Sequence, residues 1–117
     1  MDHLPIFFNI RQKSCIVIGG GDIALRKINL LLKAQAYVSC ISPVFCVGIE
    51  SLGKKNVVKI TKKKFEVSDI NDHSLIISAT NDSKVNAEVS KVAHDFGIPV
   101  NVADSPELSS FIMPSIV

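Results

Sequence analysis

Short apolar runs alternate along the chain with longer amphipathic segments. Residues 22–34 and 83–96 contain no Gly or Pro and repeat apolar residues at helical spacing, which predicts two helices. In the first of these, the helical spacing connects Ile23, Lys27, Leu30, Leu31 and Ala34. Five further runs are each typical of a short strand: residues 15–18, 36–41, 56–61, 75–79 and 98–102. Wholly apolar runs suit strands that are covered on both faces, as in parallel sheets.

The remaining segments complete an alternating order of strands and helices. Residues 44–52 fit a short helix or an irregular segment, and the apolar stretch Leu4–Ile10 fits an edge strand. Gly97 follows the second helical segment and is a good helix terminator. Alternation of strands and helices predicts a parallel sheet with right-handed crossovers. We therefore expect an α/β fold, a Rossmann-like doubly wound parallel sheet, with strand order 3-2-1-4-5 in one domain over residues 1–117.

Composition and charge exclude several classes of protein. The chain has 117 residues, of which 47% are hydrophobic and 21% charged, and these proportions exclude intrinsic disorder. The net charge of +2 is too small to indicate binding to nucleic acid or to a membrane surface. No apolar run approaches the roughly 20 residues that span a bilayer, and Met1–Pro5 lacks the features of a secretory signal.

The three cysteines indicate a reducing environment. Cys15, Cys40 and Cys46 are an odd number at wide spacings with no C-x-x-C pair, which argues against a disulfide framework and favours the cytoplasm. Cys15 and Cys40 lie in apolar runs, so we expect them to be buried as small hydrophobic residues.

A glycine-rich motif follows the first predicted strand. Residues Gly19-Gly20-Gly21-Asp22-Ile23-Ala24 match G-x-G-x-x-A at the start of the first predicted helix. In dinucleotide-binding proteins the first glycine permits a tight turn, the second lets the backbone approach a pyrophosphate, and the small third residue packs the helix on the strand. The free N–H groups at the helix start then face the phosphates. The alternative is a glycine-rich turn without a ligand, but the matched strand and helix favour dinucleotide binding.

The end of the second strand leaves the choice between NAD and NADP open. An acidic residue at this point would bind the adenosine ribose, and an arginine would favour a 2′-phosphate. Ile41-Ser42-Pro43-Val44 contains neither. Ser42 and backbone groups are then the candidates for the ribose.

Polar residues cluster at the ends of the fourth and fifth strands, where such sheets bind ligands. They are Thr80, Asn81, Asp82, Asn101, Asp104 and Ser105. Thr80 is expected beside the nicotinamide end of a dinucleotide. Asp82 is better explained as the cap of the following helix. Asp104 fits either a functional carboxylate or a turn residue before Pro106.

Six segments spread over the whole chain form a recognisable set. They are Met1–Phe7, Gly19–Ala24, Arg26–Lys27, Ser78–Asp82 with Val85–Asn86, Asn101–Asp104 and Phe111–Ile116. The set resembles the N-terminal domain of sirohaem synthase, the precorrin-2 dehydrogenase and sirohydrochlorin ferrochelatase family. The segments beyond the glycines matter most, because many unrelated proteins carry the glycines.

The resemblance implies an enzyme of tetrapyrrole biosynthesis. Such an enzyme oxidises precorrin-2 to sirohydrochlorin with NAD⁺ and then inserts Fe²⁺ to give sirohaem. By match, Gly19–Ile23 would bind the pyrophosphate, Thr80 would lie near the nicotinamide, and Asp104 corresponds to the catalytic aspartate. Ser42, Pro43 and Val44 would line the adenosine side. The resemblance favours NAD⁺ over NADP⁺ and implies a homodimer in the full-length family.

The resemblance also directs attention to charged residues and to length. The substrate carries several carboxylates, which makes Arg11, Lys13 and Arg26 candidates for binding it. Lys62–Lys64 is interpreted as a solvated loop. The scattered histidines His3, His73 and His94 lack metal-ligand spacing, so no protein-bound metal is expected.

Members of the family continue beyond the segment that ends at Ile116, into regions for dimerisation and for closing the active site. We therefore expect this chain to be a truncated form of them. Two alternatives to an enzyme follow, a non-catalytic NAD-binding sensor and a degenerate fragment that only pairs with other subunits. An apolar end over Phe111–Val117 could pair between molecules.

Overall fold

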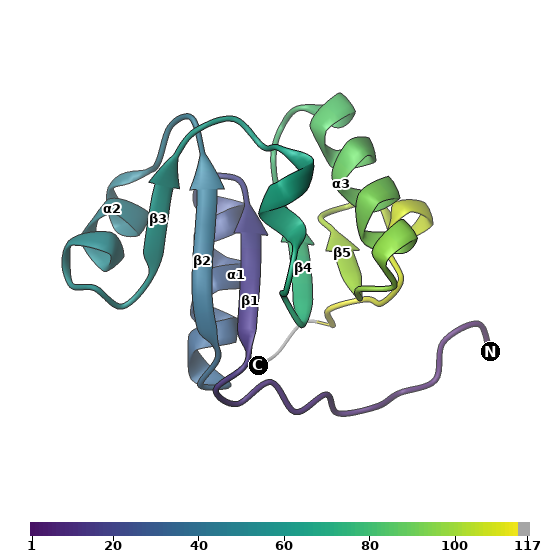
Figure 1. Cartoon of the computed structure of the whole chain (residues 1–117). Coiled ribbons are helices and arrows are strands. Elements are labelled where there is room, and N and C mark those ends of the chain that lie inside the picture. Colours follow the sequence, from purple (N-terminus) through teal and green to yellow (C-terminus); the bar gives the residue numbers. More distant parts are fainter. Residues whose placement is uncertain (115–117) are drawn as a thin grey trace.

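The computed structural model, which describes residues 1–114, contains one parallel sheet with helices on both faces (Figure 1). The strands are β1 (Ser14–Ile18), β2 (Tyr37–Ser42), β3 (Lys59–Lys62), β4 (Leu75–Ser78) and β5 (Val100–Val102). The helices are α1 (Asp22–Lys33), α2 (Val47–Lys54) and α3 (Ser83–Phe96), with two 3₁₀ helices, η1 (Val67–Ile70) and η2 (Pro106–Leu108). The strand order β3-β2-β1-β4-β5 confirms the predicted fold class and strand order.

Side chains of the three central strands, β1, β2 and β4, alternate between two apolar cores, one on each face of the sheet. On one face Cys15 and Val17 pack with Ile28 of α1. On the other face Ile16 packs with Val89 of α3. In Figure 1, α1 accordingly passes behind β1 and β2, whereas α3 lies on the opposite side beside β5. Burial on both faces explains why these strands read as continuous apolar runs in the sequence.

The buried side of α1 is rotated from the one that the sequence spacing suggests. Ala24, Ile28 and Leu31 are the buried residues of this helix, and Ile23 is 39% exposed. The glycine loop brings the helix start so close to the sheet that the small Ala24 faces the strands. Ile23 is thereby left at the surface, at the mouth of the loop.

The residues predicted to cap and to end the second long helix do so in the structure. Asp82 caps α3, because its side chain accepts hydrogen bonds from the N–H groups of Lys84 (3.0 Å) and Val85 (3.3 Å). Gly97 ends the same helix in the left-handed conformation, with φ of 68°. The segment predicted as a short helix or irregular over residues 44–52 forms α2, displaced toward the C-terminus.

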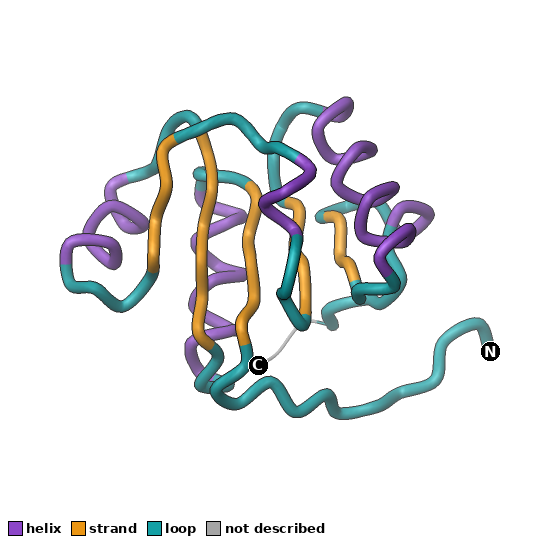
Figure 2. The backbone as a smooth tube through the Cα atoms, viewed as in Figure 1, coloured by secondary structure: helices purple, strands orange, loops and turns teal. Residues whose placement is uncertain are grey.

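The edge strand expected over Leu4–Ile10 is wrong. Residues 1–10 form no strand and run away from the sheet as an extended segment, drawn as a loop in Figure 2. A turn at residues 10–13, closed by a hydrogen bond from Lys13 N–H to the Ile10 carbonyl (3.0 Å), leads directly into β1. Because β1 is already paired with β2 and β4, the incoming segment cannot pair with the strand that it leads into.

The C-terminal segment returns to the sheet. Phe111 and Met113 pack against the core on the α1 side. The apolar end predicted over Phe111–Val117 therefore covers part of this core with its residues up to 114. The last three residues of the prediction, Ser115, Ile116 and Val117, lie outside the described residues. Within residues 1–114, no helix combines the length and the apolar character needed to cross a membrane.

Candidate functional site

A cavity of about 1100 Å³ lies at the carboxyl ends of the strands. The loops that follow β1, β2, β3, β4 and β5 all contribute to its lining. The ten residues predicted to bind the cofactor or to act in catalysis all line it: Gly19, Gly20, Gly21, Asp22, Ile23, Ser42, Pro43, Val44, Thr80 and Asp104. The parallel topology explains this convergence, because every strand of such a sheet ends at the same edge. Their individual roles stay predictions.

The glycine loop makes two close backbone contacts that exclude side chains. A Cβ at Gly19, whose φ is 135°, would collide with the carbonyl oxygen of Ala79 at the end of β4. A Cβ at Gly20 would collide with the carbonyl oxygen of Val44. Gly21 differs, since a Cβ there would meet no protein atom within 4 Å. The loop is therefore packed on two neighbouring loops and leaves open space at Gly21.

The start of α1 carries unused hydrogen-bond donors. Gly21 is the N-cap residue and no side chain among residues 1–114 caps the helix. The first backbone hydrogen bond runs from Leu25 N–H to the Gly21 carbonyl (3.0 Å), so the N–H groups of Asp22, Ile23 and Ala24 precede it. These groups, together with the positive end of the helix dipole and the space at Gly21, fit a pyrophosphate.

The end of β2 is tied to the glycine loop by short backbone hydrogen bonds. Gly19 N–H donates to the Ile41 carbonyl (2.9 Å), and Cys46 N–H donates to the Gly20 carbonyl (2.7 Å). Ser42 is only 9% exposed, and its hydroxyl accepts a long hydrogen bond from Val44 N–H (3.4 Å). This part of the lining offers mainly backbone groups and one partly engaged hydroxyl.

Asn86 of α3 organises the loop after β4. Its side-chain oxygen accepts hydrogen bonds from the hydroxyl groups of Ser78 (2.7 Å) and Thr80 (2.7 Å). Its side-chain nitrogen donates to the Thr80 carbonyl (3.0 Å). The Thr80 hydroxyl also accepts from Asp82 N–H (3.1 Å). Thr80 thus lines the cavity at a fixed position, with its hydroxyl already bonded within the loop.

Asp104 is both a turn residue and a cavity residue. Its φ is 60°, in the left-handed region, and a turn closes around it through a hydrogen bond from Ser105 N–H to the Val102 carbonyl (3.0 Å). Asp tolerates this backbone conformation better than most residues. The residue is exposed and lines the cavity, so the two interpretations offered by the sequence are compatible.

Other polar residues of the predicted cluster lie elsewhere. Asn101 and Ser105 do not line the cavity. Asn101 is buried, and its side-chain nitrogen donates to the Phe111 carbonyl (3.1 Å), which holds the C-terminal segment on the sheet. Asn81 lines the cavity.

The cationic candidates from the sequence do not converge on the cavity. Arg11 and Lys13 precede β1, at the amino ends of the strands and therefore at the opposite edge of the sheet. Arg26 lies on α1 outside the lining. His73 is near Lys13 at that opposite edge, with its Nδ1 atom 2.8 Å from the Ser14 hydroxyl, and burial lowers the pKa of its imidazole. Among residues 1–114, no three His, Cys, Asp or Glu side chains are grouped to hold a metal ion.

Several lining residues were not found from the sequence. They are Phe45, Cys46, Lys64, Phe65, Val85 and Glu88. Lys64 belongs to the basic run that the sequence analysis interpreted as a solvated loop. Its side chain is exposed, as that interpretation requires, but it also lines the cavity, which the interpretation did not include. A single-sequence pattern gives no sign that the loop after β3 folds over the ends of β1 and β2.

The three thiols differ in their environment. Burial raises the pKa of Cys15 to about 11 and is the main cause that raises the pKa of Cys40 to about 12. Cys46 is partly exposed and lines the cavity. The two buried thiols stay protonated at neutral pH and are unreactive, as small hydrophobic residues are expected to be.

The family model described as "Putative NAD(P)-binding" matches residues 6–115. A "Siroheme synthase" of Ruthia magnifica subsp. Calyptogena magnifica is 51% identical over 117 residues, which is 100% of this chain and 25% of that protein. A "Siroheme synthase" of Vesicomyosocius okutanii subsp. Calyptogena okutanii is 52% identical over the same length, again 100% and 25%.

A solved structure of "SirC, precorrin-2 dehydrogenase" superposes with a TM-score of 0.83 at 26% identity. The match covers 97% of this chain and 55% of that one. The chain is therefore homologous to the N-terminal region of sirohaem synthases, and it spans about a quarter of the length of these curated relatives.

Asn86→Ala is expected to destabilise the fold by about 2 kcal/mol, because it leaves the buried Ser78 hydroxyl and the Thr80 backbone without partners. Urea unfolding followed by circular dichroism measures the loss. Lys91→Ala is the control on the same helix, since it removes only an exposed ion pair with Asp95 and should cost about 0.5 kcal/mol or less. Equal losses in the two variants would contradict the role assigned to Asn86.

Cys46 is expected to react first with a thiol reagent at about pH 8, since the other two thiols are buried and protonated. A chromogenic disulfide reagent should show one fast thiol in the folded chain and three after unfolding in guanidinium. The fast phase should vanish in Cys46→Ser. Three thiols of equal reactivity in the folded chain would refute this assignment.

Proposed function

The chain belongs to the NAD(P)-binding family, and on that premise we propose that its cavity binds NAD⁺ as the cofactor site of a precorrin-2 dehydrogenase. The longer protein would oxidise precorrin-2 to sirohydrochlorin in sirohaem biosynthesis. One observation carries this proposal: the open glycine loop, the uncapped start of α1 and Asp104 line one cavity. The likeness to "SirC, precorrin-2 dehydrogenase" and to sirohaem synthases supports the choice of substrate.

In the proposed complex the cofactor lies across the ends of the strands. Residues Gly19–Ile23 would hold the pyrophosphate with the free N–H groups of the helix start. Ser42, Pro43 and Val44 would line the adenosine side, and Thr80 would lie beside the nicotinamide. Bound NAD⁺ would supply the acceptor for a hydride from a ring carbon of the substrate. The fixed position of Thr80 through Asn86 would keep the nicotinamide end of the cavity in shape.

Asp104 is proposed as the proton acceptor. Oxidation of precorrin-2 releases one proton in addition to the hydride, and a carboxylate beside the macrocycle can take it. Asp104 is exposed and lines the cavity, and none of the ion pairs among residues 1–114 involves it, so its carboxylate is free to meet a substrate. If the longer protein also inserts Fe²⁺, the same carboxylate could take the pyrrole protons that the metal displaces.

The rest of the substrate site would come from outside this chain. The curated relatives are about four times as long, so a grip on the macrocycle, exclusion of water and a dimer contact are proposed for their further regions. Ferrochelation and a homodimer are part of the same proposal. Free thiols at all three cysteines support a cytoplasmic location, where such groups stay reduced.

Gly21→Val tests the cofactor site. The new Cβ would meet no protein atom within 4 Å, so the fold should remain while the pyrophosphate is displaced. We expect NAD⁺ affinity, measured by calorimetry on the 117-residue chain, to fall at least about tenfold. Asn29→Val on the exposed side of α1 is the control and should leave NAD⁺ binding unchanged. Undiminished affinity in Gly21→Val, or no binding by the unmodified chain, would overturn the proposed site.

Asp104→Asn tests the proposed proton acceptor. Asn keeps the shape of the side chain and tolerates the left-handed backbone, so this variant removes the charge alone. The chain is mixed anaerobically with precorrin-2 and NAD⁺, and NADH and sirohydrochlorin are followed by absorbance. We expect the rate to fall about a hundredfold while NAD⁺ affinity stays within about twofold. Absence of turnover in the unmodified chain with NAD⁺ bound would show a cofactor domain that needs the further regions of the longer protein, and an undiminished rate in Asp104→Asn would contradict the role of Asp104.

A further inference from the structure

The loop after β3 (residues 63–66) contributes to the cavity lining on the side where β2 ends. Lys62 pairs in register with Ser42 at the end of β2, and Lys63 N–H donates to the Ser42 carbonyl (3.1 Å). The next two residues, Lys64 and Phe65, both line the cavity. The backbone of Lys63 is therefore the point at which the loop leaves the sheet and enters the lining.

Phe65 presents an aromatic ring to the cavity. Among the described lining residues, Phe45 and Phe65 are the aromatic ones. Phe45 is only 7% exposed and packs within the core on the α1 side. Phe65 is partly buried and packs against the core on the α3 side, which includes Ile41 of β2. Phe65 is therefore the aromatic ring that a planar ligand group on this side of the cavity could contact.

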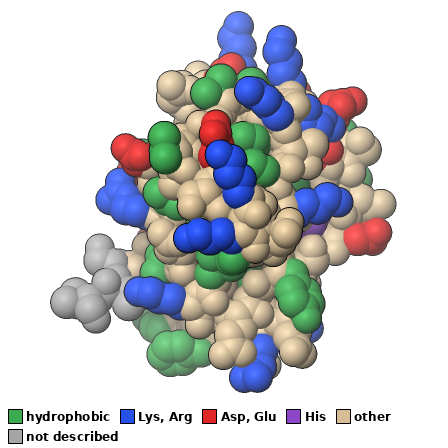
Figure 3. Space-filling model, turned by 90° about the vertical axis from the view of Figure 1, so that its left-hand side faces the viewer, with side chains coloured by type: hydrophobic (Ala, Val, Ile, Leu, Met, Phe, Trp, Pro, Cys, Tyr) green, Lys and Arg blue, Asp and Glu red, His purple; other side chains and the backbone are tan. Residues whose placement is uncertain are grey.

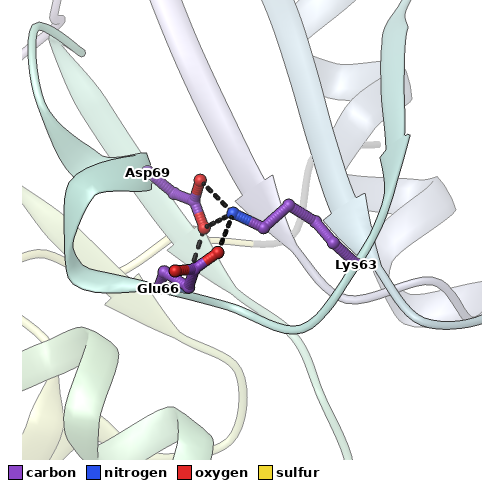
Figure 4. Close-up of polar contacts among 3 residues, drawn as sticks. All are labelled: Lys63, Glu66 and Asp69. Carbon is purple, nitrogen blue, oxygen red and sulfur yellow. Dashed lines mark hydrogen bonds and ion pairs between the residues drawn. The ribbon is translucent and has the colours of Figure 1, made fainter.

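Two acidic side chains hold the ammonium group of Lys63 (Figure 4). This group lies 2.8 Å from Asp69 Oδ1, 3.0 Å from Asp69 Oδ2 and 2.8 Å from Glu66 Oε1. The hydrogen bond to Asp69, followed by the one to Glu66, raises the pKa of Lys63, so the charge is kept at neutral pH. We call Lys63, Glu66 and Asp69 the clasp. Its lysine and its two acids lie on either side of Phe65 in the chain.

The acidic side of the clasp is anchored to the fold. Asp69 Oδ2 accepts a hydrogen bond from Glu66 N–H (2.7 Å), and Asp69 N–H donates to the Glu66 carbonyl (2.9 Å), at the start of η1. The next residue, Ile70, is fully buried in the core on the α3 side. The loop is therefore held at one end by the hydrogen bond to β2 and at the other by a turn that is packed on the core.

Lys63 differs from the other lysines of its segment. Residues 54–64 contain six lysines and no Asp or Glu. Figure 3 shows Lys and Arg side chains on the face of the molecule formed by α2 and β3. Of these six lysines, Lys63 alone takes part in an ion pair among residues 1–114. A specific role in the structure therefore falls on Lys63, and its neighbours supply matched controls.

We propose that Lys63 is a positioning residue for the dinucleotide: the clasp holds Phe65 in place, and the Phe65 ring contacts the adenine ring. The inference rests on the proposed cofactor site and adds to it a residue outside the cavity lining. A loop that is already in place favours binding, because ordering it when the ligand arrives would cost affinity. Without the Lys63 charge, the Glu66 and Asp69 carboxylates would repel each other at short range and release the loop.

Calorimetric titration of the 117-residue chain with NAD⁺ and with ADP, which lacks the nicotinamide, tests the proposal. Lys63→Met removes the charge and keeps a long side chain. We expect it to weaken the binding of both ligands by the same factor, about three- to tenfold, because both contain adenine. The control Lys62→Met removes a neighbouring exposed lysine without an ion pair among residues 1–114, and both affinities should stay within about twofold.

Three further variants separate positioning from a merely structural role. Phe65→Ala should weaken NAD⁺ binding at least about fivefold, and adding Lys63→Met should weaken it by less than about twofold more, since Lys63 acts through Phe65. Lys63→Arg should restore the affinity, because it keeps the charge between the two acids. Asp69→Asn keeps an acceptor for Glu66 N–H but removes one charge of the clasp, and it should also weaken NAD⁺ binding.

Circular dichroism first establishes that each variant is folded at the temperature of the titration, and Asp69→Asn carries the test if Lys63→Met does not fold. Additive losses in the double variant, or a loss in Lys63→Arg as large as in Lys63→Met, would overturn the positioning role. A loss confined to NAD⁺, or unchanged affinity in both Lys63→Met and Asp69→Asn, would overturn it as well. If neither ligand binds the unmodified chain, the cofactor site itself fails, and the inference fails with it.

Discussion

The close approach of the glycine loop to its neighbours is the constraint on which the site depends. Gly19 lies against the Ala79 carbonyl at the end of β4, and Gly20 lies against the Val44 carbonyl beyond β2. A side chain at either position would push the start of α1 away from both loops. The same contacts set Ala24 rather than Ile23 against the sheet and leave Gly21 facing open space. The close contacts of Gly19 and Gly20 consequently determine both the packing of α1 on the sheet and the shape of the cavity.

Much of this architecture could be predicted from the sequence because local patterns specify it. Apolar runs marked the strands, and the glycine motif between a strand and a helix marked the loop that lines the cavity. Asp82 and Gly97 marked the two ends of α3, and the structure confirms both. Each of these signals is contained within a few consecutive residues, so a single sequence is enough to find it.

What escaped prediction depends on contacts between distant segments. Leu4–Ile10 has the composition of a strand, yet it cannot pair with β1, the strand that it leads into, because β1 is already paired on both sides. Lys64 reads as part of a solvated basic run, and its place at the cavity follows from the contacts of Lys63 with Glu66, Asp69 and the end of β2. The network around Asn86 likewise joins a helix to a strand end, and spacing along the chain does not reveal it.

The strand order also determines when the cavity can exist during folding. The first three strands and the two helices between them are consecutive in the chain, whereas β4 must pair with β1 across a long intervening segment, with Cys15 opposite Leu75. Closing that segment costs chain entropy before the new contacts compensate for it. The cavity is lined from both halves of the sheet, so it is complete only after this late pairing. A ligand held there binds the folded chain alone and stabilises the junction between the halves, which is the part of the fold most costly to assemble.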